Sequence, residues 1–413
     1  MISGICPSGL KYAVKRSGRS VAYCALSIGV GTRDESGYPA GIAHFTEHTM
    51  FRGTRKKSAA VISGYLDRLG GELNAYTTKE EIVLHATVLK EDLPKAARLL
   101  VELATEATFP EAEIETERGV ILDEIIQYKD NPAEDIYDNF ECMLFKGTPL
   151  ETPILGTSAS VKKITAAMVR RFVAEKFVPG RMALTVVADI DEAQLEKSIV
   201  SLSHKLFEMP EQVGHDEPYA PASLPAMTGN LFHNVVDKHN HEVNAVIGGK
   251  APSLYQMPER LVAAFLVNIL GGPASNSLLN AELREKRGWV YGIECSYTQY
   301  KDTGIVAISF GCDKPNLEKC QAAIERILRR LRETPLSDAR LKAFRKQLLG
   351  QLAIGSESGE AQCLSMGKSM LAWGNVMSPE ETRRAIEAIT ATDLQSMAVK
   401  LFSPENLSEL VYL

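Results

Sequence analysis

The second half of this 413-residue sequence repeats the order of features found in the first half. Residues 164–179 begin with Ile-Thr-Ala and end with Phe-Val-Pro, and residues 389–404, which start 225 positions later (164 to 389), begin with Ile-Thr-Ala and end with Phe-Ser-Pro. A helix pattern that ends in two glycines occurs at residues 70–71 and again at residues 271–272. Such self-similarity indicates a duplicated architecture. We therefore predict two related domains of about 200 residues each.

Strand and helix patterns alternate within the first half. Strand patterns at residues 11–15 and 21–30 predict one hairpin, and patterns at residues 72–78 and 81–89 predict a second. Periodic apolar residues predict helices at residues 58–69, 93–107, 111–128, 132–145 and 165–177, before a strand at 182–189. Hairpins interspersed with helices favour an α+β fold, in which each domain has a mostly antiparallel sheet packed with helices.

A proline-rich stretch separates the two halves. Residues 209–230 hold four prolines, two glycines and few β-branched residues, a composition typical of a linker. We accordingly expect an N-terminal domain at residues 1–208, the linker at 209–230, and a homologous C-terminal domain at 231–413.

The composition argues against several classes of protein. The net charge of −6 gives no sign of a basic surface, so we expect no binding to nucleic acid. No apolar run reaches the length of a membrane span, so we expect no membrane association. The N-terminus lacks the apolar core of a signal peptide, which indicates a cytoplasmic location. The seven cysteines, an odd number without a CxxC spacing, indicate reduced thiols rather than disulfides.

The sequence His44-Phe45-Thr46-Glu47-His48 lies in a predicted helix at residues 41–51. Residues four apart lie one turn apart on the same helical face, so His44 and His48 converge on one point and Glu47 leans toward it. A catalytic zinc site needs one more protein donor and keeps a position for water. A glutamate beside the metal can take the proton from that water. The H-x-x-E-H order is the inverzincin signature, although a surface helix with two unrelated histidines would show the same pattern.

Three segments extend this motif, namely HFTEHTMFRGT, LGGELNAYTTKE and ERGVILDEI. With them the chain resembles the pitrilysin, insulin-degrading enzyme and mitochondrial processing peptidase family of zinc endopeptidases, as a small two-domain bacterial-type member. The family's third zinc ligand matches Glu124, 76 residues beyond His48 (48 to 124), and a further family glutamate matches Glu117, seven residues before it (117 to 124). The resemblance therefore implies one Zn²⁺ per chain, held by His44, His48 and Glu124, with Glu47 as the catalytic base.

Glu117 falls on the same helical face as Glu124, two turns away. The resemblance implies that Glu117 assists catalysis by orienting a histidine or tuning the site. On the residue pattern alone, Glu117 would be a solvated helix charge.

Two further segments match the substrate-binding parts of this family. Asn74, Ala75 and Tyr76 match the sheet edge to which the peptide adds as a strand, an arrangement in which main-chain hydrogen bonds give affinity without demanding a particular sequence. Without the resemblance, this segment would be a turn that leads into a strand.

Arg284 and Tyr291 match an arginine and tyrosine pair that holds substrate carbonyls and helps to stabilise the oxyanion during catalysis. By composition alone they would be a helix-end charge and a strand aromatic.

These features predict a zinc-dependent metalloendopeptidase that acts on oligopeptides or unfolded polypeptides. Two-domain members of the family work as clam-like dimers that enclose a chamber. Because this one chain carries both the zinc set and the arginine and tyrosine pair, we expect a homodimer. The alternatives are a subunit of a heterodimeric peptidase, a non-catalytic subunit that binds peptides or has a structural role, and a metal hydrolase with a non-peptide substrate. Non-catalytic members usually lose part of HxxEH or the distal glutamate, and this sequence keeps both.

Three histidines lie outside the motif but bear on the site. His85 stands where many relatives have an aromatic residue, and we expect a satisfied sheet residue there. His239 and His241 would share one face of a strand and could mimic a metal site, but the sequence suggests no third donor for them.

Overall fold

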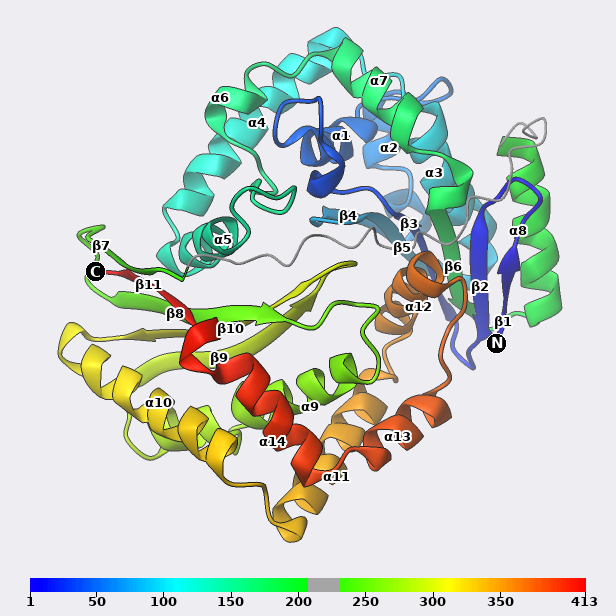
Figure 1. The fold of residues 1–413 in the computed structure, drawn as a ribbon. Coiled ribbons are helices and arrows are strands. Elements are labelled where there is room, and N and C mark those ends of the chain that lie inside the picture. The colour runs from blue at the N-terminus through cyan, green and yellow to red at the C-terminus, as the bar shows by residue number, and fades with distance from the viewer. Residues whose placement is uncertain (207–230) are drawn as a thin grey trace. The chain divides into compact units, whose positions relative to one another are not determined.

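A computed structural model describes residues 1–206 and 231–413, so the predicted linker at 209–230 lies outside the described residues. The described chain forms two compact units, each built on one sheet with helices on both faces (Figure 1). Unit 1 contains residues 1–126, 152–206 and 353–377, and unit 2 contains residues 127–151, 231–352 and 378–413.

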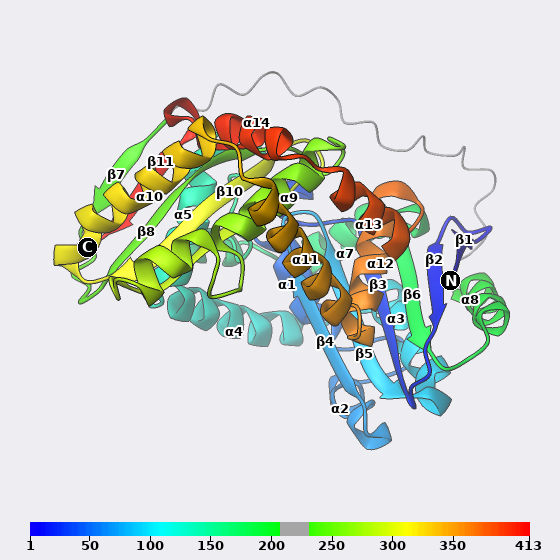
Figure 2. The same ribbon diagram turned by 90° about the horizontal axis from the view of Figure 1, so that it is seen from below.

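Unit 1 is built on a six-stranded sheet. The strand order is β1 (Ile2–Ile5), β2 (Lys11–Arg16), β6 (Met182–Ala188), β3 (Val21–Ile28), β5 (Ile82–Leu89) and β4 (Glu72–Thr77). The β2–β6 pair is parallel and the other four pairs are antiparallel. Strand β4 forms one edge of the sheet (Figure 2). The predicted hairpin of β4 with β5 is confirmed.

The predicted hairpin of β2 with β3 is wrong, although both strands exist. Strand β6 lies between them, parallel to β2 and antiparallel to β3. All seven residues of β6 are buried, because this strand has neighbours on both edges and packed layers on both faces. Strand β6 is distant from β2 and β3 in sequence. The short connection between β2 and β3 therefore holds no signal that another strand lies between them.

The two faces of the unit 1 sheet are covered by different helices. Helix α3 (Leu93–Glu106) packs on one face, and helix α12 (Gly359–Trp373) packs on the other (Figure 1). Helix α12 approaches the sheet closely at Gly367, where an added Cβ atom would lie 2.3 Å from Ser27 Oγ. A side chain at this position would require either the Ser27 hydroxyl or α12 to move.

Unit 2 repeats this arrangement with five strands. Their order is β7 (His233–Val236), β11 (Ser408–Tyr412), β8 (Val243–Ala251), β10 (Gly304–Cys312) and β9 (Val290–Gln299). If these five strands are numbered 1 to 5 along the chain, their order across the sheet is 1-5-2-4-3. The strands β2 to β6 of unit 1, numbered in the same way, have the same order. In both units the first and fifth strands are parallel. The prediction of an α+β fold with two related, mostly antiparallel domains is confirmed.

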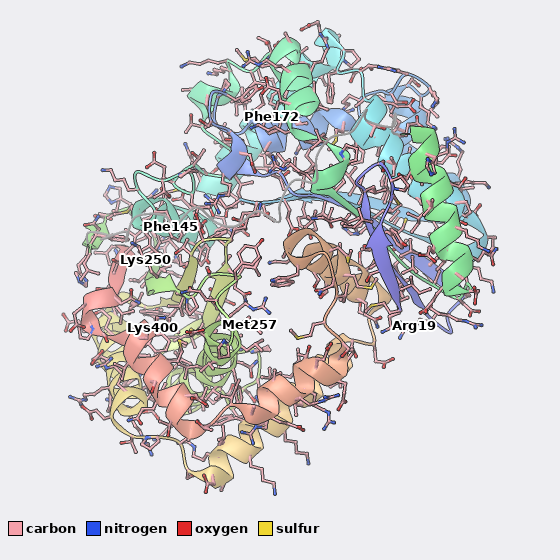
Figure 3. All side chains as sticks on the ribbon, turned by 45° about the vertical axis from the view of Figure 1, so that its right-hand side comes forward. Arg19, Phe145, Phe172, Lys250, Met257 and Lys400 are labelled. Atoms are coloured by element: carbon pink, nitrogen blue, oxygen red, sulfur yellow. The ribbon has the colours of Figure 1, made fainter. Side chains whose placement is uncertain are left out.

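Each unit also contains a helix from the other half of the sequence. Helix α5 (Pro132–Leu144) packs on strands β8, β10 and β11 of unit 2, next to the buried Phe145 that Figure 3 labels. Helix α12, from the second half, packs on the sheet of unit 1. The expected domain boundaries at 208 and 231 did not include this exchange. Periodicity shows that a helix has an apolar face, but it does not show which sheet that face covers.

The remaining helical segments connect the strands. In the first half they are η1 (Thr32–Asp34), α1 (Ile42–Met50), α2 (Ala59–Ser63), η2 (Asp67–Leu69), η3 (Lys90–Asp92), α4 (Glu111–Lys129), α6 (Ser158–Val161), α7 (Ala166–Lys176), η4 (Pro179–Arg181) and α8 (Glu192–Leu206). In the second half they are α9 (Glu259–Gly271), η5 (Asn280–Glu285), η6 (Lys314–Asn316), α10 (Leu317–Glu333), α11 (Asp338–Gly355), α13 (Pro379–Ala388), α14 (Ala391–Phe402) and η7 (Pro404–Asn406). Within residues 1–206 and 231–413, none of these helices has the length and hydropathy that a bilayer crossing requires.

Two local expectations are corrected by the structure. The helix predicted at residues 58–69 is two short segments, α2 and η2, because the chain leaves the helical conformation at Gly64. The strand expected to carry His239 and His241 is a loop between β7 and β8, where His239 has a positive φ of 58°. The seven cysteines, all within the described residues, form no disulfide bond with one another.

Candidate metal centre

Helix α1 carries the HFTEH motif and is capped by a distant carboxylate. The helix follows Gly41, whose φ of 88° turns the chain sharply into the first turn. The two carboxylate oxygens of Glu35 accept hydrogen bonds from the N–H groups of Gly41 and Ala43, each at 2.9 Å. Burial raises the pKa of Glu35 to about 8. Sequence analysis missed this cap because capping signals are sought next to a helix, and Glu35 stands six residues before Gly41.

The structure brings His44, His48 and Glu124 together. The two imidazole rings lie 4.6 Å apart between centroids, because their residues are one turn apart on α1. Glu124 reaches them from helix α4, and its Oε2 atom lies 3.7 Å from His44 Nε2 and 3.6 Å from His48 Nε2. Within the described chain, no other three His, Cys, Asp or Glu side chains come as close to one another as this group does.

The three donors fit a zinc ion. A tetrahedral ion with ligand bonds of about 2.0–2.1 Å separates its donor atoms by roughly 3.3 Å, close to the two distances from Glu124. Glu124 Oε2 is buried and has no hydrogen-bond partner among the described residues, although an orphaned buried oxygen is costly. Two imidazole nitrogens and one carboxylate oxygen are also a donor set that catalytic zinc sites use.

His44 is held as a neutral imidazole. It is 6% exposed, and this burial, with a smaller contribution from His48, lowers the pKa of His44 to about 3. Zinc binds an unprotonated ring nitrogen. At neutral pH His44 is therefore already in the form that can bind zinc. Its other nitrogen, Nδ1, is buried without a hydrogen-bond partner in the described part of the chain, so packing alone orients this ring.

Glu47 lies beside this group but is not one of the three donors. Its Oε2 atom accepts a hydrogen bond of 2.7 Å from the hydroxyl of Thr77, on strand β4. Burial raises the pKa of Glu47 above its ordinary value, and the Thr77 hydrogen bond opposes part of that rise. A carboxyl group with a raised pKa and one fixed oxygen suits a proton acceptor.

Glu117 contacts one of the histidines directly. It projects from α4, and its Oε2 atom lies 3.0 Å from His48 Nδ1. Its other oxygen, Oε1, makes an ion pair with Arg52, a contact that lacks hydrogen-bond alignment. Glu117 is therefore not a solvated helix charge. Sequence analysis missed Arg52, because this residue lies two positions beyond the end of α1 and helical spacing does not place it.

The predicted substrate-binding segment forms the edge strand β4. Asn74 pairs with His85 of β5, and Tyr76 lies near that histidine with 6.2 Å between ring centroids. His85 Nδ1 also lies 3.0 Å from Glu360 of α12, so His85 has the satisfied sheet environment that we expected. Ala75 points to the opposite face of the strand, with Thr77, toward the layer that holds α1.

Arg284 and Tyr291 belong to unit 2, whereas the three donors belong to unit 1. Arg284 is exposed on the π-helical segment η5. Tyr291 occupies a β-bulge, because Gly311 pairs with Gly292 and the next residue, Cys312, pairs with Val290. A bulge re-aims the side chain of its extra residue, and Tyr291 is accordingly 55% exposed. Its hydroxyl donates a 2.7 Å hydrogen bond to Asp313, which raises the pKa of Tyr291 to about 12.

Solved structures share this fold. A crystal structure of a protease from Helicobacter pylori aligns with a TM-score of 0.90 at 19% identity, over 100% of this chain and 98% of that one. The peptidase M16 inactive domain from Pseudomonas fluorescens aligns with a TM-score of 0.87 at 18% identity, over 100% of this chain and 97% of that one.

Sequence comparison gives the family. The insulinase (peptidase family M16) pattern matches residues 11–158, and the pattern of the peptidase M16 inactive domain matches residues 163–348. An uncharacterized zinc protease of Rickettsia felis is 30% identical over 382 residues, which are 92% of this chain and 90% of that protein. Another from Streptomyces coelicolor is 29% identical over 395 residues, which are 95% of this chain and 85% of that protein. The HxxEH order lies within the first matched region, and the chain belongs to peptidase family M16.

Proposed function

We propose that the protein is a zinc-dependent metalloendopeptidase that hydrolyses peptide bonds in oligopeptides or unfolded polypeptides. The observation that carries the proposal is the convergence of His44, His48 and Glu124 beside Glu47, a buried carboxyl group outside the donor set. Relatives in the same family that are named zinc proteases support it.

The chain's own residues supply the proton transfers of this reaction. Zinc, when bound by the three donors, would lower the pKa of a water molecule and polarise the scissile carbonyl. Glu47 is placed to accept the proton that the attacking water loses, because the Thr77 hydroxyl fixes one of its oxygens. The same carboxyl group then delivers the proton to the leaving amine. The raised pKa of Glu47 favours this second step.

Strand β4 supports a peptide substrate. An edge strand of a sheet has one row of backbone N–H and C=O groups without a strand partner, and an extended peptide can pair with that row. Thr77 of this strand contacts Glu47, so a peptide added along β4 would run beside the base. An unfolded segment can offer an extended strand in this way.

We also propose that the active form is a homodimer that encloses a chamber. One chain carries both the zinc donors and the exposed Arg284 and Tyr291, so two copies suffice without a second gene product. Arg284 and Tyr291 would hold the substrate carbonyls and the oxyanion. The mass in solution tests this directly by analytical ultracentrifugation, where a monomer at working concentration would contradict the proposal.

The activity is tested with a quenched, unstructured peptide. We expect the protein to bind one zinc per chain and to cleave this peptide, to lose cleavage with 1,10-phenanthroline, and to regain it when zinc is restored. A tightly folded protein should resist cleavage until it is unfolded. Zinc binding without cleavage of any peptide would instead favour a non-catalytic or heterodimeric subunit, and cleavage that chelators do not affect would exclude the zinc mechanism.

A further inference from the structure

Glu117 is a buried carboxylate whose two oxygens have different partners. Its side chain is 2% exposed, and a buried charge is destabilising unless it is paired. Oε2 contacts His48 Nδ1 at 3.0 Å, and Oε1 contacts the guanidinium of Arg52. One carboxylate from α4 thus contacts two residues of the same stretch of chain, the histidine and an arginine beyond the end of α1.

Arg52 is placed so that it links the two helices of the metal centre. It follows His48 by four residues and lies two residues beyond Met50, where α1 ends. Its side chain is 37% exposed and so stays in contact with water, whereas the side chain of its partner Glu117 is 2% exposed. The ion pair therefore offsets a charge that water cannot reach, and it ties α4, which carries Glu124, to the helix that carries both histidines.

The two histidines differ in how they are oriented. The side chain of His44 is 8% exposed, so packing fixes its ring. The side chain of His48 is 22% exposed, and its Nδ1 atom contacts Glu117. If Nδ1 carries the proton that Glu117 accepts, then Nε2 keeps its lone pair, and this atom faces Glu124 Oε2 at 3.6 Å. The orientation of His48 thus depends on the position of the Glu117 carboxylate.

We propose that Arg52 is a positioning residue of the zinc site, which acts through Glu117. It holds this carboxylate against His48 and so presets the Nε2 atom of His48 for zinc. This inference rests on the proposed zinc site, but it does not depend on whether the protein cleaves peptides.

The test compares zinc affinity in three variants of the full chain. Arg52→Met removes the guanidinium, Arg52→Lys keeps the charge without the planar fork, and Arg55→Met changes an exposed arginine whose side chain has no ion pair within the described residues. The zinc dissociation constant is measured by competition with a chromophoric chelator, and the urea midpoint is measured on the zinc-free proteins. We expect Arg52→Met to weaken zinc binding by about 10- to 100-fold, Arg52→Lys to recover part of this loss, and Arg55→Met to match the wild type.

A double-mutant cycle separates this role from a simple helix-packing role. If Arg52 acts through Glu117, then Arg52→Met should cause little further loss of zinc affinity in a Glu117→Gln background. Additive losses would overturn the inference, as would an Arg52→Met protein that binds zinc as tightly as the wild type. If Arg52→Met does not fold, Arg52→Lys takes its place in the same cycle and decides. A wild type that binds no zinc would instead refute the proposed function.

Discussion

The cap on helix α1 predicts an unusual dependence of stability on pH. Glu35 is 6% exposed, and its burial raises the pKa to about 8 from an ordinary value of 4.5. At low pH the carboxyl group of Glu35 is protonated in both the folded and the unfolded protein. As the pH rises above 4.5, the unfolded chain releases this proton, whereas the folded protein keeps it until about pH 8. The folded state therefore loses stability across this window and loses no more above it.

The size of the effect follows from the two pKa values. Each unit of difference corresponds to about 1.4 kcal/mol, and integration between pH 5 and pH 9 gives a loss of about 4 kcal/mol from this one group. In Glu35→Gln the group cannot ionise, so this loss is absent. The stability of the wild type relative to Glu35→Gln should thus fall by about 4 kcal/mol from pH 5 to pH 9.

The assay is urea unfolding of the zinc-free protein at several values of pH. Zinc is removed because its binding depends on pH in its own right. Glu91→Gln is the matched control, because Glu91 is exposed and its loss should leave the wild-type pH dependence unchanged. If Glu35→Gln follows the wild-type curve at every pH, the buried cap does not have a raised pKa and the reasoning is refuted.

Three further changes test other parts of the site and fold. Thr77→Val removes a hydrogen bond that lowers the pKa of Glu47, so the acidic limb of the pH–rate profile should move to higher pH with zinc content unchanged; an unmoved limb would count against Glu47 as the base. Tyr291→Phe should lower kcat by about 10²-fold with little change in zinc affinity, and a loss of zinc instead would show that Tyr291 is misplaced. Gly367→Val should lower the free energy of unfolding by about 1–3 kcal/mol, measured in urea, because its Cβ atom would meet Ser27; a neutral result would show that Ser27 or α12 can shift freely.

The convergence of the two histidines in the candidate metal centre could be predicted from sequence because its signal is local and strong. His44 and His48 are one turn apart, so any helix at this place brings their rings together. Glu124 lies far along the chain, and only the family resemblance pointed to it. The capping and positioning groups Glu35 and Arg52 were missed, because each acts through a contact that a spacing rule does not describe.

The sheets show the same division between local and distant information. The β4–β5 hairpin was predicted correctly because its turn joins adjacent strands. The β2–β3 hairpin was wrong because β6, the last strand of the unit, is inserted between them. The exchange of α5 and α12 was likewise hidden, since each helix has an apolar face that either sheet could cover.

The central claim, that Glu47 is the proton carrier of a zinc peptidase, is tested most directly by Glu47→Gln. The wild type and the variant are loaded with zinc, their zinc content is measured, and their turnover of the same unstructured peptide is compared. We predict equal zinc content, because the three donors are intact, with turnover lost in the variant. Wild-type turnover by the zinc-loaded Glu47→Gln protein would contradict the account.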